Sequence, residues 1–163
     1  VTPPESVYKR IKKENNAIGE ARAINSDLQF FKEKFIMPVE GIISGVYGSQ
    51  RFYNGNPGNP HYGVDIARPT GTPVYSPGPG LVTLAEPDLF YSGGTVILDH
   101  GYGLSSSFLH MSRIGVEVGD VLDVGDQIGA IGATGRATGP HLDWRMSWFN
   151  QRIDPQLLVP PMP

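Results

Sequence analysis

Near Met37 the sequence changes its character, and this change restricts the possible folds more than any other feature. Every lysine lies at or before Lys34, whereas the chain beyond Met37 consists of short apolar segments separated by glycine and proline. The 163 residues include 21 Gly and 15 Pro, and only 18% are charged. Such punctuation is typical of short strands joined by turns. We therefore predict an N-terminal arm or linker over residues 1–36 and a mainly β domain over residues 37–163.

Seven segments of the second part are predicted as strands, because apolar and β-branched residues are bounded there by turn residues. Their number and spacing favour a curved antiparallel β-sheet or a sandwich. The predicted strands are residues 42–46, 72–75, 80–85, 94–99, 104–109, 127–131 and 141–148.

The N-terminal arm has the composition of a helix. Its charged residues and an approximately helical spacing of apolar residues predict a helix from Glu5 to about Ser26. A short extended stretch is predicted to follow, from Asp27 to Phe35. The sequence leaves open whether the arm is a linker, a docking helix or a cover for a groove.

Composition excludes several classes of function. The net charge of -3 and the pI of about 5.8 give no basic footprint, which argues against nucleic acid as a partner. No apolar run approaches the roughly 18 residues needed to span a bilayer, so we expect a soluble chain, and we expect a monomer. Because the chain has no cysteine, any metal must be held by His, Asp, Glu or Asn.

The first candidate site is the pair His61 and Asp65. In an extended chain these residues would lie roughly 13 Å apart, too far to share one metal ion. A bend is therefore required, and Gly63 between them offers the conformational freedom for it. Taken alone, the pair is explained as well by a surface histidine beside a turn and an aspartate that caps a loop.

The second candidate site lies on the last predicted strand, where polar and apolar residues alternate strictly. His141, Asp143, Arg145 and Ser147 would project from one face. The roots of His141 and Asp143 would lie about 7 Å apart, which suits one metal ligand plus one catalytic group. A strand with one solvated face explains the alternation almost as well. The apolar residues of the segment share the opposite, core-facing side; they are Leu142, Trp144, Met146 and Trp148. Of the other histidines, His100 is predicted in a hairpin turn, and the default interpretation of His110 is a buried, hydrogen-bonded side chain.

From Pro38 to Leu158 the chain resembles the lysostaphin or LytM-like family of cell-wall zinc peptidases. Six segments carry the resemblance, and they occur in the family's order. They are 61–67 (HYGVDIA), 71–75 (GTPVY), 99–103 (DHGYG), 109–112 (LHMS), 118–120 (VGD) and 134–142 (TGRATGPHL).

The resemblance implies one Zn²⁺ ion held by His61, Asp65 and a third ligand, with His110 and His141 flanking the reacting water and carbonyl. In the family the last motif is His-x-His, and its second histidine is the third ligand. This chain has Asp143 at that position. A carboxylate ligates zinc at roughly 2.0–2.2 Å, close to the distance for imidazole, so Asp143 is the expected third ligand. Two carboxylates should reduce the Lewis acidity of the ion.

The function implied by the resemblance is zinc-dependent hydrolysis of peptide cross-links in peptidoglycan, with stem peptides or cross-bridges as partners and a periplasmic or secreted location. His141 is the expected base and His110 the expected oxyanion partner. Which cross-link is cleaved stays open, since specificity would depend on the loops at residues 54–60 and 87–93. Family members are often kept latent by upstream segments, and Asn54 or Asn59 would be candidates to close the metal's open position.

Two alternative functions compete with hydrolysis. Residues 116–129 are similar to the turn of biotinyl and lipoyl carriers, but a carrier needs an acceptor lysine and none follows Lys34. The stronger alternative is a catalytically impaired family member that binds cell wall or regulates another hydrolase. Such a protein typically loses several site residues, whereas here one ligand position is changed and four are retained, which favours the enzyme.

Overall fold

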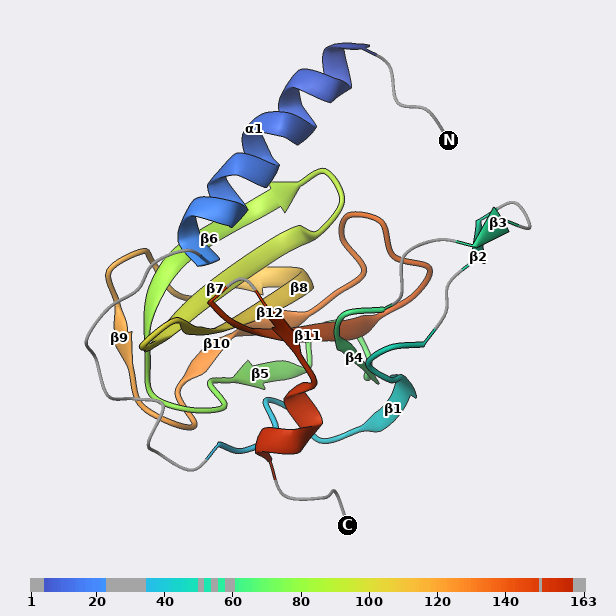
Figure 1. Ribbon diagram of the computed structural model, residues 1–163. Coiled ribbons are helices and arrows are strands. Elements are labelled where there is room, and N and C mark those ends of the chain that lie inside the picture. Colours follow the sequence, from blue (N-terminus) through green and yellow to red (C-terminus); the bar gives the residue numbers. More distant parts are fainter. Residues whose placement is uncertain are drawn as a thin grey trace.

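The protein, in a computed structural model, is built around one antiparallel sheet, and the structure describes residues 5–22, 35–49, 52–53, 56–57, 61–149 and 151–159. The sheet has ten strands (Figure 1). Its main path runs in the order β1 (Ile42–Gly45), β4 (Val64–Ala67), β11 (His141–Trp148), β8 (Leu104–Ile114), β7 (Gly93–Gly101), β6 (Gly80–Leu89) and β9 (Val121–Leu122). Off this path, β10 (Gln127–Ile131) pairs with β5 (Pro73–Tyr75) and β8, and β12 (Gln151–Ile153) pairs with β11. The prediction of a mainly β, curved antiparallel fold with an N-terminal helix is confirmed.

Strand β8 changes its pairing partner at one residue. Residues Leu104 to Leu109 pair with β11, whereas Met111 to Ile114 pair with β10. His110 lies between these two runs and has a φ of 64°, in the left-handed region that non-glycine residues rarely adopt. The bend at His110 therefore redirects β8 from one part of the sheet to another.

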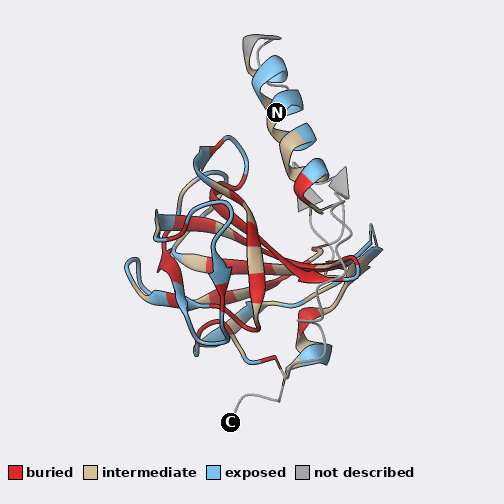
Figure 2. Cartoon of the chain, turned by 90° about the vertical axis from the view of Figure 1, so that its left-hand side faces the viewer, coloured by how far each residue is buried: buried red, intermediate tan, exposed pale blue. Residues whose placement is uncertain are grey.

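The main core lies on one face of the sheet, and Figure 2 shows its buried residues at the centre of the strands. Fully buried side chains of β4, β7, β8 and β11 fill it. The largest are Trp144, Phe108, Ile66, Leu98, Met111, Leu142 and Met146. The apolar face predicted for β11 is thus confirmed, except that Trp148, at the end of the strand, is 54% exposed and packs against Phe149.

The helix α1 (Glu5–Arg22) covers the opposite face of β6 and β7. Ala17, Ile18 and Ala21 pack against a small apolar cluster on those strands. Near the other end, the Glu14 carboxylate accepts a hydrogen bond from the backbone N–H of Phe90, at 2.8 Å. This cover explains why β7 is buried along its whole length. Within the described ranges, no helix is long and apolar enough to cross a membrane.

Two of the seven predicted strands agree with the structure at both ends. The strands at residues 127–131 and 141–148 have the predicted bounds, and the other five overlap observed strands. The short strands β4, β9 and β12 were not predicted, nor were the two-stranded ribbon of β2 (Phe52–Tyr53) and β3 (Asn56–Pro57) and the 3₁₀ helix η2 (Pro155–Leu158). Residues 27–34, Asn54 and Asn59 lie outside the described residues, and the domain boundary near residue 37 stays a prediction.

The prediction that His100 is a turn residue was wrong. Its side chain is fully buried at the end of β7, and its ring lies edge-on to Phe35 with the ring centroids 4.7 Å apart. Nδ1 is 2.6 Å from the carbonyl oxygen of Pro79, which can only accept, so Nδ1 donates. Nε2 therefore accepts from the hydroxyl of Ser106, at 2.7 Å. Burial lowers the pKa of His100 from 6.5 to about 4.

This buried histidine makes stability depend on pH. Because the folded pKa is below the unfolded one, the unfolded chain binds more protons between these two values, and the folded state loses stability as the pH falls from 6.5 to about 4. We expect His100 to account for a loss of about 3 kcal/mol over this window. Urea unfolding of wild type and His100→Asn at several pH values measures it. The variant should be less stable at pH 7, and its free energy of unfolding should change less with pH than that of wild type. Equal slopes of this free energy against pH in the two proteins would contradict the assignment.

Candidate metal centre and active site

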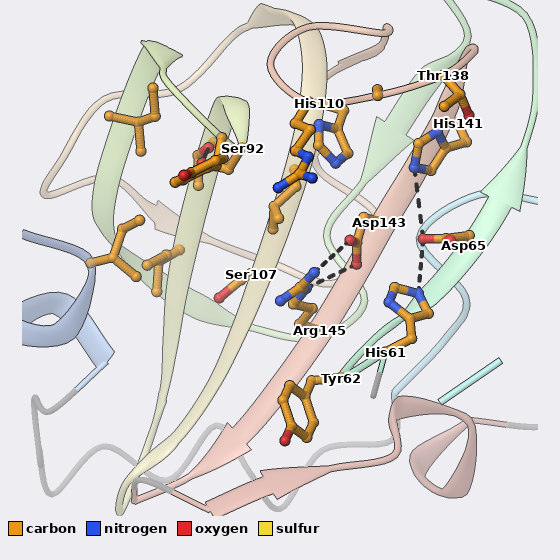
Figure 3. A pocket seen from close by; sticks show the side chains of 18 of the residues that line it. His61, Tyr62, Asp65, Ser92, Ser107, His110, Thr138, His141, Asp143 and Arg145 are labelled. Atoms are coloured by element: carbon orange, nitrogen blue, oxygen red, sulfur yellow. Dashed lines mark hydrogen bonds and ion pairs between the residues drawn. The ribbon is translucent and has the colours of Figure 1, made fainter. Parts of the chain in front are cut away.

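A cleft of about 1020 Å³ contains all five residues singled out as candidate ligands or catalytic groups. Its walls come from α1, β4, β7, β8, β11 and the loop that precedes β11. Figure 3 shows Asp65, Asp143 and His141 on neighbouring strands, with His61 from the segment before β4 beside Asp65 and with His110 facing His141 across the cleft. The structure therefore brings together every residue that the sequence proposed for the site.

Two carboxylates form the base of the site. Asp65 on β4 and Asp143 on β11 are direct cross-strand partners, so two negative side chains project side by side. Like charges directly opposite each other destabilise a sheet unless a positive charge lies between them. Two glycines make room for these side chains: a Cβ at Gly45 would lie 2.6 Å from Asp65 Oδ2, and a Cβ at Gly63 would collide with Asp143 Oδ1. The role of Gly63 is therefore space, and its φ is not positive.

His61 lies beside these carboxylates and is buried, with 1% of its surface exposed. Its Nε2 atom is 3.0 Å from Asp65 Oδ1. The expected bend between the two residues is present, because the chain bends at Gly63, immediately before β4, and Asp65 lies within that strand. One ligand atom from each of His61, Asp65 and Asp143 lies within 4.8 Å of the other two.

The two remaining histidines have defined tautomers in their neutral forms. Nδ1 of His110 lies 2.7 Å from the carbonyl oxygen of Thr134, and Nδ1 of His141 lies 2.8 Å from that of Gly139. A carbonyl oxygen only accepts, so both Nδ1 atoms carry the proton and both Nε2 atoms have a lone pair. The ring centroids are 5.0 Å apart, and His141 Nε2 is 3.7 Å from Asp65 Oδ1. The pair therefore presents two proton acceptors to the cleft.

His110 combines backbone strain with burial. Its positive φ is held by the hydrogen bond from its own N–H to the carbonyl oxygen of Ser92, at 2.7 Å, together with the Nδ1 bond described above. Strain of this kind is often found at functional sites. Burial lowers the pKa of His110, and this outweighs the opposing effect of the bond to Thr134. The ring is therefore biased toward its neutral, proton-accepting form.

Arg145 is a residue of the site that sequence reasoning did not single out. Its Nε donates to Asp143 Oδ1 at 3.1 Å, and its Nη2 donates to Asp143 Oδ2 at 2.9 Å. The only signal in the sequence was its position, two residues after Asp143 on the same face of the strand. Because this side chain was assigned only to a polar face, its interaction with a candidate ligand was missed.

The donor set fits a divalent cation. One imidazole nitrogen and two carboxylate oxygens are ligands that zinc accepts, and tetrahedral ligands at roughly 2.0–2.1 Å lie roughly 3.3 Å apart. The separation of His61 Nε2 and Asp65 Oδ1 is close to this value. The third candidate ligand, Asp143, has a different environment, because Arg145 donates a hydrogen bond to each of its two carboxylate oxygens. His61, Asp65 and Asp143 are thus the residues that would hold the ion.

Comparison with known proteins identifies the family. Residues 59–155, which include all five site residues, match the model for peptidase family M23. The chain belongs to peptidase family M23. The resemblance to lysostaphin-type peptidases is confirmed: the M23 domain superposes on the catalytic domain of lysostaphin from Staphylococcus simulans with a TM-score of 0.60 and 32% identity, covering 69% of this chain and 86% of that one.

Two relatives from Vibrio cholerae are also similar to this M23 domain. The peptidoglycan DD-endopeptidase ShyA is 42% identical over 87 residues, which are 53% of this chain and 20% of ShyA. The crystal structure of a zinc-containing peptidase superposes with a TM-score of 0.70 and 31% identity, covering 80% of this chain and 41% of that one. The chain thus spans only part of the length of these relatives.

Proposed function

We propose that this M23 domain is a zinc-dependent endopeptidase that hydrolyses D,D peptide cross-links of peptidoglycan. The observation that carries the proposal is the convergence of His61, Asp65 and Asp143 in one cleft, beside two histidines whose Nε2 atoms carry lone pairs. ShyA, named for this activity, supports the choice of bond. A location in the cell envelope follows from such a substrate.

In this proposal the protein's own residues bind the ion, orient the reacting groups and transfer protons. Zinc, when bound, supplies Lewis acidity toward the scissile carbonyl and lowers the pKa of water. His141 takes the proton of the attacking water at Nε2, which lies 3.7 Å from Asp65 Oδ1. Neutral His110 has no proton at Nε2, so it stabilises an oxyanion only after it has received the proton that His141 took from the water; the two ring centroids lie 5.0 Å apart. It then serves as the proton donor to the leaving amine.

Digestion of purified peptidoglycan tests the proposed function. The protein with one equivalent of zinc should convert cross-linked muropeptide dimers to monomers, and mass spectrometry of the fragments identifies the bond that is cut. Chelation should abolish the release and added zinc should restore it. Intact dimers in the presence of bound zinc would overturn the proposal and would favour a regulatory or wall-binding role.

A further inference from the structure

The ion pair between Arg145 and Asp143 lies inside the proposed metal site. Its two hydrogen bonds, at 2.9 and 3.1 Å, engage both oxygens of the carboxylate, and Asp143 is only 2% exposed. Bidentate pairs of arginine with carboxylate are among the stronger charge-assisted hydrogen bonds. Figure 3 shows this pair as a separate branch of the site, next to the group formed by Asp65 and the two histidines His61 and His141.

The local backbone makes room for this pair. Both residues project from the polar face of β11, and Gly63 passes directly against them. A Cβ at position 63 would collide with Asp143 Oδ1 and would lie 2.7 Å from Cγ of Arg145. Glycine at this position therefore permits the arginine to reach back to the carboxylate.

The guanidinium supplies a positive charge where a divalent ion would supply one. Asp143 stands opposite Asp65, so a cation is needed beside at least one of these carboxylates. We propose that Arg145 is an internal cation that competes with zinc for Asp143 and so weakens the affinity of the site for the metal. The inference rests on the proposed metal site and goes beyond it, since it assigns a residue that sets the affinity.

Two other arginines share the cleft with Arg145. Arg22 of α1 and Arg152 of β12 line the same cleft. Burial, with the neighbouring charges of Arg22 and Arg145, lowers the pKa of Arg152 to about 10. Burial and the charge of Arg145 likewise lower the pKa of Arg22. A divalent ion that enters the cleft therefore meets the positive charges of Arg22 and Arg152 as well as that of Arg145.

Zinc affinity, measured by competition with a chromophoric chelator, tests the proposal without any assay of hydrolysis. Arg145→Gln should bind zinc roughly 10–100-fold more tightly than wild type, the range that corresponds to loss of a hydrogen bond to a charged group. The matched control is Arg152→Gln, which removes the same charge from the same cleft but makes no contact with Asp143 in the hydrogen bonds described above. The change in zinc affinity caused by Arg152→Gln should be several-fold smaller than that caused by Arg145→Gln. Equal changes in the two variants, or weaker binding by Arg145→Gln, would overturn the proposal.

A double-mutant cycle separates competition from a purely structural effect. In the background Asp143→His the pair no longer exists, so adding Arg145→Gln should change zinc affinity no more than adding Arg152→Gln does. The metal-free Arg145→Gln protein should also melt below wild type and gain more from saturating zinc, because its carboxylates lack their counter-ion. Full additivity in the cycle would overturn the proposal. Failure to cut peptidoglycan, with the affinity changes as expected, would overturn only the proposed function.

Discussion

Replacing His141 with alanine is expected to lower the rate of peptidoglycan hydrolysis roughly 10²–10⁴-fold, the usual contribution of a general base. The reason is geometric. His141 is held by its Nδ1 bond to Gly139, so its Nε2 lone pair lies 3.7 Å from Asp65 Oδ1, at the edge of the proposed metal ligands. It is a proton acceptor beside the ligands and is not one of the three, so zinc affinity should stay within a few-fold of wild type.

The measurements are initial rates of dimer cleavage and zinc affinity on the same preparations. The comparison variant is His110→Ala, which should also slow cleavage, because the two rings lie 5.0 Å apart and share the proton transfers. The double variant should be little slower than the slower single variant, as is usual for residues that act as a unit. A His141→Ala protein that binds zinc and cleaves at the wild-type rate would remove His141 from the mechanism.

The sequence allowed the site to be located because ligand types and strand periodicity are both local properties. Strict alternation placed His141 and Asp143 on one face of β11, and the structure keeps that face and that register. The motif order joined them to His61, Asp65 and His110. The placement on β11 required only that the segment adopt its preferred local structure, whereas the grouping of the five residues rested on the resemblance to the family.

The features that were missed depend on contacts between distant segments. His100 follows a predicted strand and precedes Gly101, which suggested a turn, yet tertiary packing buries it against Pro79 and Ser106. The space at Gly63 is defined by β11, about 80 residues later, so conformational freedom seemed the reason for glycine there. Likewise, nothing in the sequence of β7 indicates that α1 covers this strand.

Arg145 shows how a local pattern can be correct and still incomplete. Period two assigned it to the polar face, where a solvated arginine is the usual expectation. Its guanidinium instead turns back along the strand to Asp143, because Gly63 leaves that path open. Which group a side chain contacts depends on the neighbouring strand, and the pattern of residues within one strand does not show it.

Trp144→Ala is expected to lower the free energy of unfolding by about 3–5 kcal/mol, the range for large aromatic residues removed from a core. Trp144 is fully buried in β11, and its side chain belongs to the main core, on the face opposite that of His141 and Arg145. The loss combines the apolar area that is no longer buried with the cavity that the ring leaves behind.

Trp144→Phe is the informative comparison, since the indole Nε1 is buried without a hydrogen-bond partner among the described residues. Removing that unpaired donor recovers part of its desolvation cost, about 1–3 kcal/mol, and offsets much of the lost volume. Urea unfolding at pH 7 should therefore show a cost for the phenylalanine variant of less than half that for alanine, with zinc affinity retained. Equal costs would mean that the indole nitrogen is satisfied in solution and that Trp144 contributes polar as well as apolar stabilisation to the strand that carries the site.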